Sequence, residues 1–280
     1  MTNRSTRMSF TNRVAVITGA GSGIGRALAL ALAERGCHLA LADIRSESLD
    51  ETRQLLQTTL AARPELRVST HLLDVGSATA IENFPAAVLA LHPEVNLLFN
   101  NAGVAIEGNF SEIKPGDFEW LMDINFWGVV RMTRAFLPLL ERSEIAHITN
   151  ISSLFGLIAP AGQSAYVASK FAVRGFSDAL RHELEDGHIG VTVVCPGGVN
   201  TSIARNARQS RELAAADLEK RLARVQKLLR LPPQRAAEVI LAAVERRQPR
   251  VIVGNDAKLG ALAERLMPIA YWKLARKLMF

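Results

Sequence analysis

The stretch VAVITGAGSGIGRALALALAERG, residues 14–36, decides the fold of this chain. An apolar, β-branched run, Val14–Thr18, leads into a glycine-rich turn, and Arg26–Arg35 then has the composition of a helix. A strand, glycines and a helix start together make an anion site, because backbone N–H groups and the helix dipole point at the ligand and glycine lets the backbone approach it. We expect a pyrophosphate here, with a simple tight turn as the alternative.

The glycine spacing narrows this expectation. The common G-x-G-x-x-G fingerprint fits in neither frame, since it needs glycine at Ile24 or at Arg26. What is present is T-G-x-x-x-G-x-G over Thr18–Gly25. The predicted cofactor-binding residues of this turn are Gly19, Ser22, Gly23, Ile24 and Gly25.

Apolar runs alternate with helical stretches along most of the chain. Such alternation indicates βαβ units, and nearly continuous apolar strands indicate a sheet covered on both faces. We predict an α/β fold: a Rossmann-like doubly wound parallel sheet with helices on both faces. The strands are expected at Val14–Thr18, His38–Ala42, Arg67–Leu73, Asn96–Asn100, His147–Ser152, Val191–Cys195 and Val251–Gly254, and the helices near 24–35, 46–62, 77–90, 117–142, 164–186 and 234–247.

Asp43 ends the second strand, 18 residues past Gly25. A carboxylate at this place accepts both hydroxyls of an adenosine ribose and repels a 2′-phosphate, so it favours NAD over NADP. Ser22 adds no positive charge for a phosphate. Arg45 lies just beyond the strand, within reach of a 2′-phosphate, so NADP remains possible. The alternative role of Asp43 is an acid at the start of the next helix.

Three further strand ends carry candidate residues, because ligands of open α/β sheets bind at the carboxyl edge. Asp74 and Val75 face an adenine or cap the next helix. Asn101, Ala102 and Gly103 follow the fourth strand and let the backbone pass a flat ligand, or form an ordinary turn. Pro196, Gly197, Val199 and Thr201 follow the last long strand, where Thr201 would bond a carboxamide; a simple loop is the alternative.

Tyr166 and Lys170 are four residues apart in a helical segment and so share one helix face. A neighbouring cation favours the phenolate and would lower the tyrosine pKa from about 10, making Tyr166 a usable acid or base. Ser153 lies at the end of an apolar strand and supplies a hydroxyl for the same substrate oxygen. Asn125 is a polar residue amid apolar ones in a helix, either structural or holding a water against Lys170.

Length and composition fit one globular domain over residues 1–280, with 49% apolar and 21% charged residues. Residues 1–12 resemble a loose polar tail rather than a signal peptide, and no apolar run approaches the ~18 residues of a membrane span, so a cytoplasmic location follows by default. Cys37 and Cys195 are read as buried small hydrophobes, and the six scattered histidines predict no metal site.

Positive charge gathers in the last part of the chain. Residues 201–280 hold 17 Lys and Arg against 7 Asp and Glu. A membrane surface, nucleic acid or a solvated helical lobe all fit this charge; we favour the lobe and no nucleic acid.

Residues 200–233 contain a long charged helical run and no strand, as in a substrate lid. Residues 255–280 form an amphipathic extension, with Leu259, Leu262, Ala263 and Leu266 at helical spacing up to about Pro268. We expect 258–280 to be buried in the chain or an oligomer, or to lie on a membrane.

Together these motifs resemble the short-chain dehydrogenase/reductase family, over about Thr11–Thr201 and the unit near 234–254. The resemblance implies strand order 3-2-1-4-5-6-7 and a homodimer or homotetramer. It implies that Ser153 polarises the substrate oxygen, that Tyr166 is the acid or base, that Lys170 lowers its pKa and bonds the nicotinamide ribose, and that Asn125 holds a water. The matching motifs are TGxxxGxG at 18–25, NNAG at 100–103, YxxxK at 166–170 and PGxVxT at 196–201.

Three functions fit these residues. The first is an NAD-dependent oxidoreductase of secondary alcohols or ketones. The second is an NADP-dependent carbonyl reductase, and the third is a dinucleotide-binding sensor or scaffold without turnover. A hydrophobic small-molecule substrate is favoured by apolar residues that either line the pocket or pack the core, namely Val104, Ala105, Ile106, Leu154, Phe155, Leu157 and Ile158.

Overall fold

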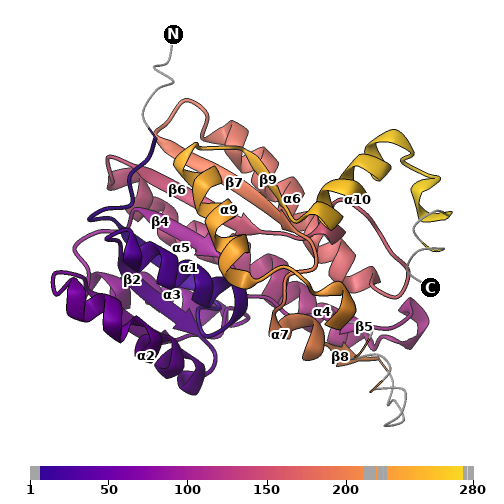
Figure 1. Cartoon of the computed structure of the whole chain (residues 1–280), viewed down its shortest axis with the longest axis horizontal. Helices are drawn as coiled ribbons and strands as arrows, with labels where there is room; N and C mark the ends of the chain where they lie inside the picture. Colours follow the sequence, from indigo (N-terminus) through magenta and orange to yellow (C-terminus); the bar gives the residue numbers. More distant parts are fainter. Residues whose placement is uncertain (1–6, 211–218, 220–222, 224–225, 274–275, 277–280) are drawn as a thin grey trace.

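The computed structural model describes residues 7–210, 219, 223, 226–273 and 276. Seven parallel strands form one sheet in the order β3-β2-β1-β4-β6-β7-β9 (Figure 1). Counted within this sheet alone, the order is 3-2-1-4-5-6-7, which confirms the predicted topology. The strands are β1 (Val14–Thr18), β2 (His38–Asp43), β3 (Val68–Leu72), β4 (Leu97–Asn100), β6 (Ala146–Ile151), β7 (Ile189–Pro196) and β9 (Arg250–Val253).

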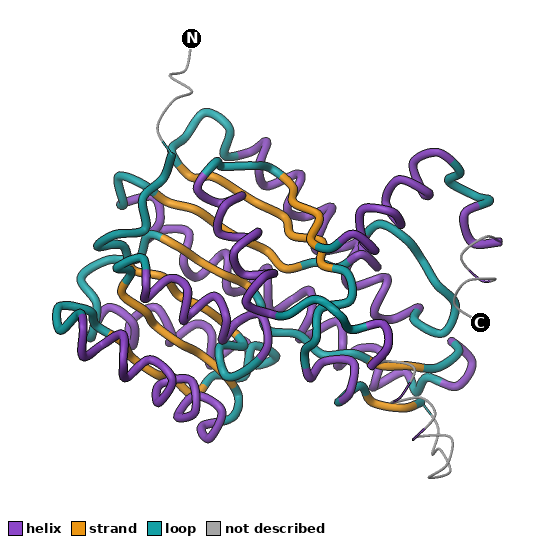
Figure 2. Tube along the Cα trace, in the orientation of Figure 1, coloured by secondary structure: helices purple, strands orange, loops and turns teal. Residues whose placement is uncertain are grey.

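Helices cover both faces of the sheet (Figures 1 and 2). Because side chains alternate along a strand, β1 sends Ile17 into one core and Val16 into the other. The helices of the first face are α1 (Gly23–Glu34), α2 (Ser46–Ala62) and α9 (Pro233–Glu245), and those of the second are α3 (Ala78–Leu89), α5 (Gly128–Arg142) and α6 (Ser164–Glu183). Because helices pack against both faces of the sheet, the carboxyl edge of the sheet is where a ligand can bind.

The helix expected near 117–142 is three elements. α4 (Pro115–Met122) passes into a π-helical turn, Asp123–Trp127, before α5 begins at Gly128. A π-turn inserts one extra residue and rotates the side chains that follow it. Composition does not reveal such a turn, so the sequence predicted one continuous helix. Two short 3₁₀ helices, Phe110–Glu112 and Leu154–Gly156, also lie at this edge of the sheet.

A second, two-stranded parallel sheet lies beyond the carboxyl edge, pairing β5 (Ile106–Glu107) with β8 (Arg208–Gln209). The prediction of no strand within 200–233 was therefore wrong, because two residues are too few to show alternation. The Arg208 guanidinium lies 3.5 Å from the ring centre of Trp120 and 2.8 Å from an Asp117 oxygen. α7 (Ser202–Arg205) precedes β8, and most of the predicted charged helical run lies outside the described residues.

The described part of the N-terminal tail is not loose. Met8 and Phe10 are buried in the core beneath α1 and α9, and the Met8 amide donates to the Glu245 carbonyl at 2.9 Å. Alternating apolar residues in a short polar context carry a weak sequence signal, so the prediction of a loose tail over 1–12 fails from residue 7 onward. Cys37 and Cys195 are buried free thiols, as predicted.

His147 on β6 is a buried imidazole that cannot easily take a second proton. The Thr192 hydroxyl donates to the Gln248 carbonyl and so accepts from His147 Nε2–H at 2.8 Å. His147 Nδ1 faces Gly190 and has no hydrogen-bond partner. Burial lowers the pKa of His147 to about 3. The folded chain therefore binds fewer protons than an unfolded histidine with a pKa of about 6.5.

We expect the free energy of unfolding to be highest above about pH 6.5 and to fall as the pH drops from there toward 3. At about 1.4 kcal/mol for each pKa unit, the loss from His147 reaches several kcal/mol. Urea unfolding at neutral pH and at about pH 5 measures it. His147→Gln should flatten the pH dependence, whereas the exposed His182→Gln should leave it unchanged; equal slopes in all three proteins would contradict this account.

Candidate active site

The glycine turn between β1 and α1 forms a cradle of bare backbone. Gly19 and Gly23 have φ of +65° and +54°, which side chains disfavour. A Cβ on Gly25 would strike the Gly19 carbonyl oxygen. No acidic residue lies in the first turn of α1, and the Ser22 N-cap makes no side-chain cap bond. The positive end of α1 therefore faces the turn uncompensated, which fits the phosphates of a dinucleotide.

The segment after β4 is fixed against this turn. Thr18 Oγ1 accepts hydrogen bonds from the amides of Asn101 and Ala102 at 3.0 and 3.1 Å. The Asn101 side chain in turn donates to the carbonyls of Thr18 and Gly19 at 2.9 and 3.2 Å. Asn101 thus binds the glycine turn through its side chain, and its predicted contact with a cofactor stays a prediction. Thr18 was predicted only as part of the glycine motif, without a role of its own; its place directly before the glycine turn was the available signal.

Asp43 lies at the end of β2 and faces the glycine turn. One carboxylate oxygen accepts from the Gly21 amide at 2.9 Å and the other from the Arg45 amide at 3.1 Å. Each oxygen keeps a lone pair for a ribose hydroxyl. The Arg26 guanidinium, which lies close by, donates to the Gly21 carbonyl and pairs with Glu51 at 2.6 Å. The cation nearest the turn is therefore already neutralised.

Asp74 and Val75, which were predicted to face an adenine, follow β3, the strand beside β2. Ile44 is an exposed apolar side chain directly after Asp43, and sequence analysis passed over it. Asp74 is exposed, and its carboxylate accepts from the Gly76 amide at 2.8 Å before α3 begins. The N-cap of α3 is Ser77, whose hydroxyl accepts from the Ala80 amide, so Asp74 is not the cap of this helix, and its contact with an adenine stays a prediction. Val75 is buried, and its carbonyl lies against Gly128.

Ser153, Tyr166 and Lys170 come together at the carboxyl end of β6. The Ser153 hydroxyl lies beside the Tyr166 phenol, where it acts to lower the pKa of Tyr166, and it also accepts from the Phe155 amide at 3.1 Å. Lys170 Nζ lies 5.6 Å from the ring centre of Tyr166 and donates to the Ile151 carbonyl at 3.1 Å. Lys170 is buried on α6, so strand β6 and helix α6 together position all three groups.

Burial dominates the protonation of these groups. It raises the pKa of Tyr166 to about 12, while the hydrogen bond from Ser153 acts in the opposite direction. Burial also lowers the pKa of Lys170 to about 8. The sequence led us to expect a lowered Tyr166 pKa, because it showed the neighbouring cation but not the depth of burial. In the chain by itself the phenol is protonated at neutral pH.

Asn125 is fully buried in the π-helical turn. Its amide oxygen accepts from the Val104 amide at 2.8 Å, and its nitrogen donates to the Val104 carbonyl at 2.9 Å and to Ser169 Oγ at 3.1 Å. It therefore joins the segment after β4 to helix α6. A Cβ on Gly103 would lie 3.1 Å from the Asn125 oxygen and 3.5 Å from Lys170 Nζ, so backbone passes close to both groups.

We expect Asn125→Ala to lower both stability and turnover. It removes the partners of the partly buried Val104 amide and carbonyl, at up to about 1–3 kcal/mol for each group. Thermal unfolding and steady-state kinetics measure the two losses. Asn83→Ala, on the exposed face of α3, removes a side-chain hydrogen bond to the Thr79 carbonyl and serves as the control. If Asn125→Ala had the melting temperature of the wild type, the hydrogen bonds of Asn125 would not join the segment after β4 to helix α6 in the way described.

The segment after β7 reaches back to the glycine turn. A Cβ on Gly23 would lie 2.9 Å from Thr201 Cγ2, and Ser22 and Ser202 hydroxyls are 3.4 Å apart. Gly197 donates to the Val253 carbonyl at 2.8 Å, and Val199 is buried. A cavity of about 300 Å³ borders both segments; Arg26, Arg205 and Asn200 are among its lining residues. The structure thus joins residues 22 and 201, which the sequence placed on separate loops.

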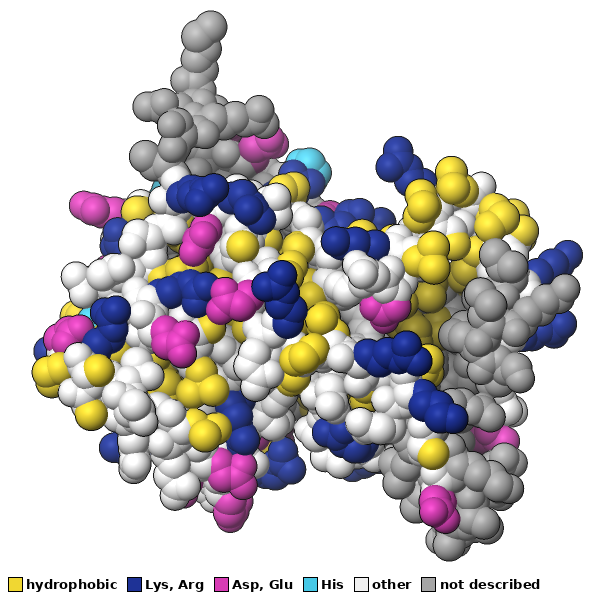
Figure 3. All heavy atoms as spheres, in the orientation of Figure 1, with side chains coloured by type: hydrophobic (Ala, Val, Ile, Leu, Met, Phe, Trp, Pro, Cys, Tyr) yellow, Lys and Arg dark blue, Asp and Glu magenta, His cyan; other side chains and the backbone are white. Residues whose placement is uncertain are grey.

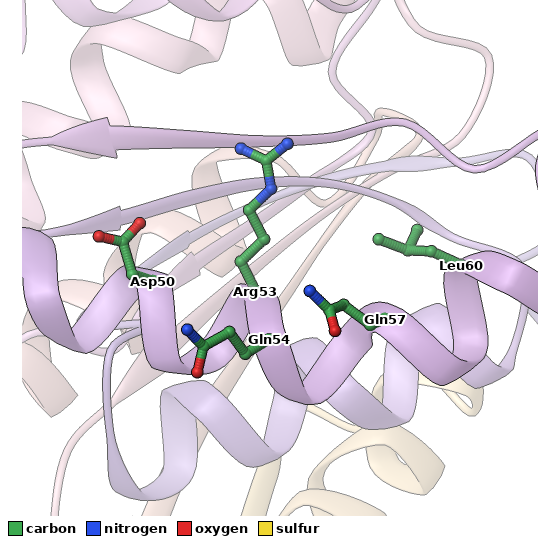
Figure 4. Close-up of a pocket in the computed structure, with 5 residues that line it drawn as sticks. All are labelled: Asp50, Arg53, Gln54, Gln57 and Leu60. Carbon is green, nitrogen blue, oxygen red and sulfur yellow. The ribbon is translucent and has the colours of Figure 1, made fainter.

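A second hollow, of about 430 Å³, lies on the outer face of α2, away from this site (Figure 4). Its side chains, Asp50, Arg53, Gln54, Gln57 and Leu60, come from a single helix. No strand end or glycine turn contributes to it. We assign it no role in ligand binding. Among the described residues, no cluster of His, Cys, Asp or Glu has the arrangement of a metal site.

This fold and site define a dinucleotide-binding α/β oxidoreductase. The family model described as short chain dehydrogenase matches residues 13–212. The chain belongs to the short-chain dehydrogenase/reductase family. It is 44% identical over 272 residues to a protein of Mycobacterium tuberculosis named putative oxidoreductase SadH, with 95% of each chain covered.

Solved structures agree with this assignment. A short-chain dehydrogenase/reductase from Burkholderia phymatum, in complex with NAD, superposes with a TM-score of 0.83 at 31% identity, covering 92% of this chain and 95% of that one. An alcohol dehydrogenase from Thermococcus sibiricus, complexed with 5-hydroxy-NADP, gives 0.72 at 26% identity over 86% and 95%. These complexes support a nicotinamide dinucleotide as the cofactor, either NAD or NADP.

Proposed function

We propose that this protein transfers hydride between NAD(H) and a hydrophobic secondary alcohol or ketone, with Tyr166 as the proton donor or acceptor. The observation that carries the proposal is the convergence of the Ser153 and Tyr166 side chains beside the buried Lys170 at the carboxyl edge of the sheet. These groups stand where β6 ends, and Gly103, in the segment after β4, lies close to Lys170. The set contains a hydroxyl donor, an acid and a buried cation.

When bound, the nicotinamide ring supplies or takes the hydride. Ser153 holds the substrate oxygen and limits its rotation, while the Tyr166 hydroxyl gives a proton to that oxygen during carbonyl reduction. The raised pKa of Tyr166 keeps this proton in place at neutral pH. In alcohol oxidation Tyr166 must accept a proton, and the charge of Lys170 and the hydrogen bond from Ser153 stabilise the phenolate that does so.

The surroundings of Tyr166 support an apolar substrate. The Phe155 ring meets the Tyr166 ring edge to face at 6.1 Å. Val104 and Tyr166 border a small apolar cluster that includes Ile106, Ile113 and Leu121. Leu157 and Ile158 are buried and belong to the packing of the chain, whereas Val104, Ala105, Leu154 and Phe155 are partly exposed at the edge of the site. A sugar would find few hydrogen-bond partners on this wall.

NAD is the proposed coenzyme. The Asp43 carboxylate lies at the end of β2 beside the glycine turn, where it would accept from ribose hydroxyls, and Arg26 is paired with Glu51, so the charge here opposes a 2′-phosphate. An NADP-dependent reductase is the second candidate, because Arg45 is exposed two residues after Asp43. Isothermal titration with each coenzyme separates the two: a preference for NADP would contradict the role given to Asp43.

A substrate panel with both coenzymes tests the proposed reaction. It spans sugars, short alcohols and steroid or long-chain secondary alcohols with the matching ketones, and follows absorbance of the reduced nicotinamide. We expect kcat/KM to increase with apolar substrate size. Preference for sugars would overturn the substrate class. Tight dinucleotide binding without turnover of any member would instead favour a sensor or scaffold.

A further inference from the structure

The C-terminal arm, residues 255–273, exposes an apolar face. It consists of α10 (Asn255–Leu266) and the turn and short helical stretch after it. Leu259, Leu262 and Leu266 recur at helical spacing and are 65%, 52% and 69% exposed. Five of the fourteen exposed large hydrophobic side chains in the described chain lie between residues 259 and 269. Figure 3 shows them gathered on the arm at the upper right.

The opposite face of the arm is fixed to the active site. The Asp256 carboxylate accepts from the Gly198 amide at 2.6 Å, in the segment after β7. A Cβ on Gly260 would lie 2.9 Å from Leu154 Cδ1, so α10 lies close against the segment that follows Ser153. The Tyr271 hydroxyl accepts from the Ala159 amide at 2.8 Å. The arm is therefore anchored at both ends, and these contacts fix the position of its outward-facing leucines.

One predicted alternative was that the leucine stripe of the arm is buried within the chain, and the exposed leucines do not fit it. The helix α10 ends at Leu266, close to the predicted end at about Pro268, but the leucine stripe points outward. Ile269 at the turn is 92% exposed. A face of this kind needs a covering partner, because exposed contiguous apolar surface is unfavourable in water.

The charges beside the stripe distinguish between partners. Lys258, Arg265, Lys273 and Arg276 are exposed on or beside the arm. Its two acids are Glu264 and Asp256, and Asp256 already accepts from the Gly198 amide. Blue side chains flank the apolar face in Figure 3. A two-fold contact between copies of the arm would bring these like charges together. An anionic lipid surface would neutralise them while its acyl chains receive the leucines.

We infer that the C-terminal arm docks this protein on anionic membrane surfaces. The leucine face lies at the boundary between headgroups and acyl chains, and the basic side chains contact lipid phosphates. No helix among the described residues is long and apolar enough to span a bilayer, so the contact is peripheral. Docking through the arm also places the segment after Ser153 beside the lipid, within reach of an apolar substrate.

Vesicle flotation of the full-length protein tests the docking. We expect binding to phosphatidylcholine vesicles that contain phosphatidylglycerol, roughly tenfold weaker binding to phosphatidylcholine alone, and a loss of binding in high salt. The triple variant Leu259→Ser/Leu262→Ser/Leu266→Ser should bind anionic vesicles at least about tenfold less. Leu55→Ser/Leu72→Ser, at exposed leucines on α2 and β3, is the matched control and should bind like the wild type.

Two further measurements keep the test decisive. Circular dichroism and thermal melting must show that the triple variant is folded; if it is not, Lys258→Glu/Arg265→Glu replaces it, with the same loss expected. Light scattering reports the mass of each protein in solution. The inference fails if the wild type does not bind anionic vesicles at low salt, or if either arm variant binds unchanged. If the wild type does not bind vesicles, and the triple variant has a lower mass in solution than the wild type, the leucine face is a self-association surface instead. Neither result depends on turnover, so the proposed reaction stands or falls separately.

Discussion

Tyr166→Phe should abolish turnover while leaving dinucleotide affinity nearly unchanged. The substitution removes one hydroxyl, the group that exchanges a proton with the substrate oxygen in the proposed reaction. General acid–base catalysis contributes roughly 10²–10⁴-fold, so we expect kcat to fall by about a thousandfold in both directions. The ring stays and keeps its contact with Phe155, so the pocket keeps its shape. Steady-state kinetics and isothermal titration with NAD measure the two quantities.

The chain provides its own control for this experiment, because it has two tyrosines. Tyr271→Phe also removes a single phenolic hydroxyl, one that accepts from the Ala159 amide at 2.8 Å. Its kcat should stay within about tenfold of the wild type, since that hydrogen bond to the backbone is worth about 1 kcal/mol. If Tyr166→Phe retained activity to a similar extent, Tyr166 would not be the acid or base.

Asp43→Ala should reverse the coenzyme preference. The variant loses two charge-assisted hydrogen bonds to the adenosine ribose and the repulsion of a 2′-phosphate. At about 1.5 kcal/mol or more for each bond, affinity for NAD should fall by roughly a hundredfold, and the relative use of NADP should rise. The ratio of kcat/KM for NAD to that for NADP is the measurement.

Two more variants separate charge from structure at this position. Asp43 also accepts from the Gly21 and Arg45 amides, so alanine loosens the glycine turn as well. Asp43→Asn keeps one acceptor oxygen and the shape of the side chain, and should give an intermediate change. Asp50→Ala removes an equal charge from the exposed face of α2 (Figure 4) and should not alter the ratio. A change of equal size in Asp50→Ala would mean that overall charge, not the ribose contact, sets the preference.

The sequence by itself determined the layered fold and the positions of its strand ends. β1 and α2 have the predicted bounds, and the alternation of apolar runs and helical stretches predicted a parallel sheet covered by helices; the order of its seven strands came from the family resemblance. These features are local: a β-branched run, a helical period and a glycine turn are properties of neighbouring residues. Tyr166 and Lys170 share a helix face for the same reason, and Asp43 stands at the end of β2.

The tertiary structure decided what those residues touch. The contact of Thr201 with Gly23, the inward position of Asn125 in a π-turn and the pairing of β5 with β8 all join segments far apart in the chain or depend on a single inserted residue. Burial, which raises the pKa of Tyr166 where the sequence predicted a lower one, is the sum of packing from several elements. The outward leucines of α10 belong here too, because periodicity defines a stripe but not which surface it faces.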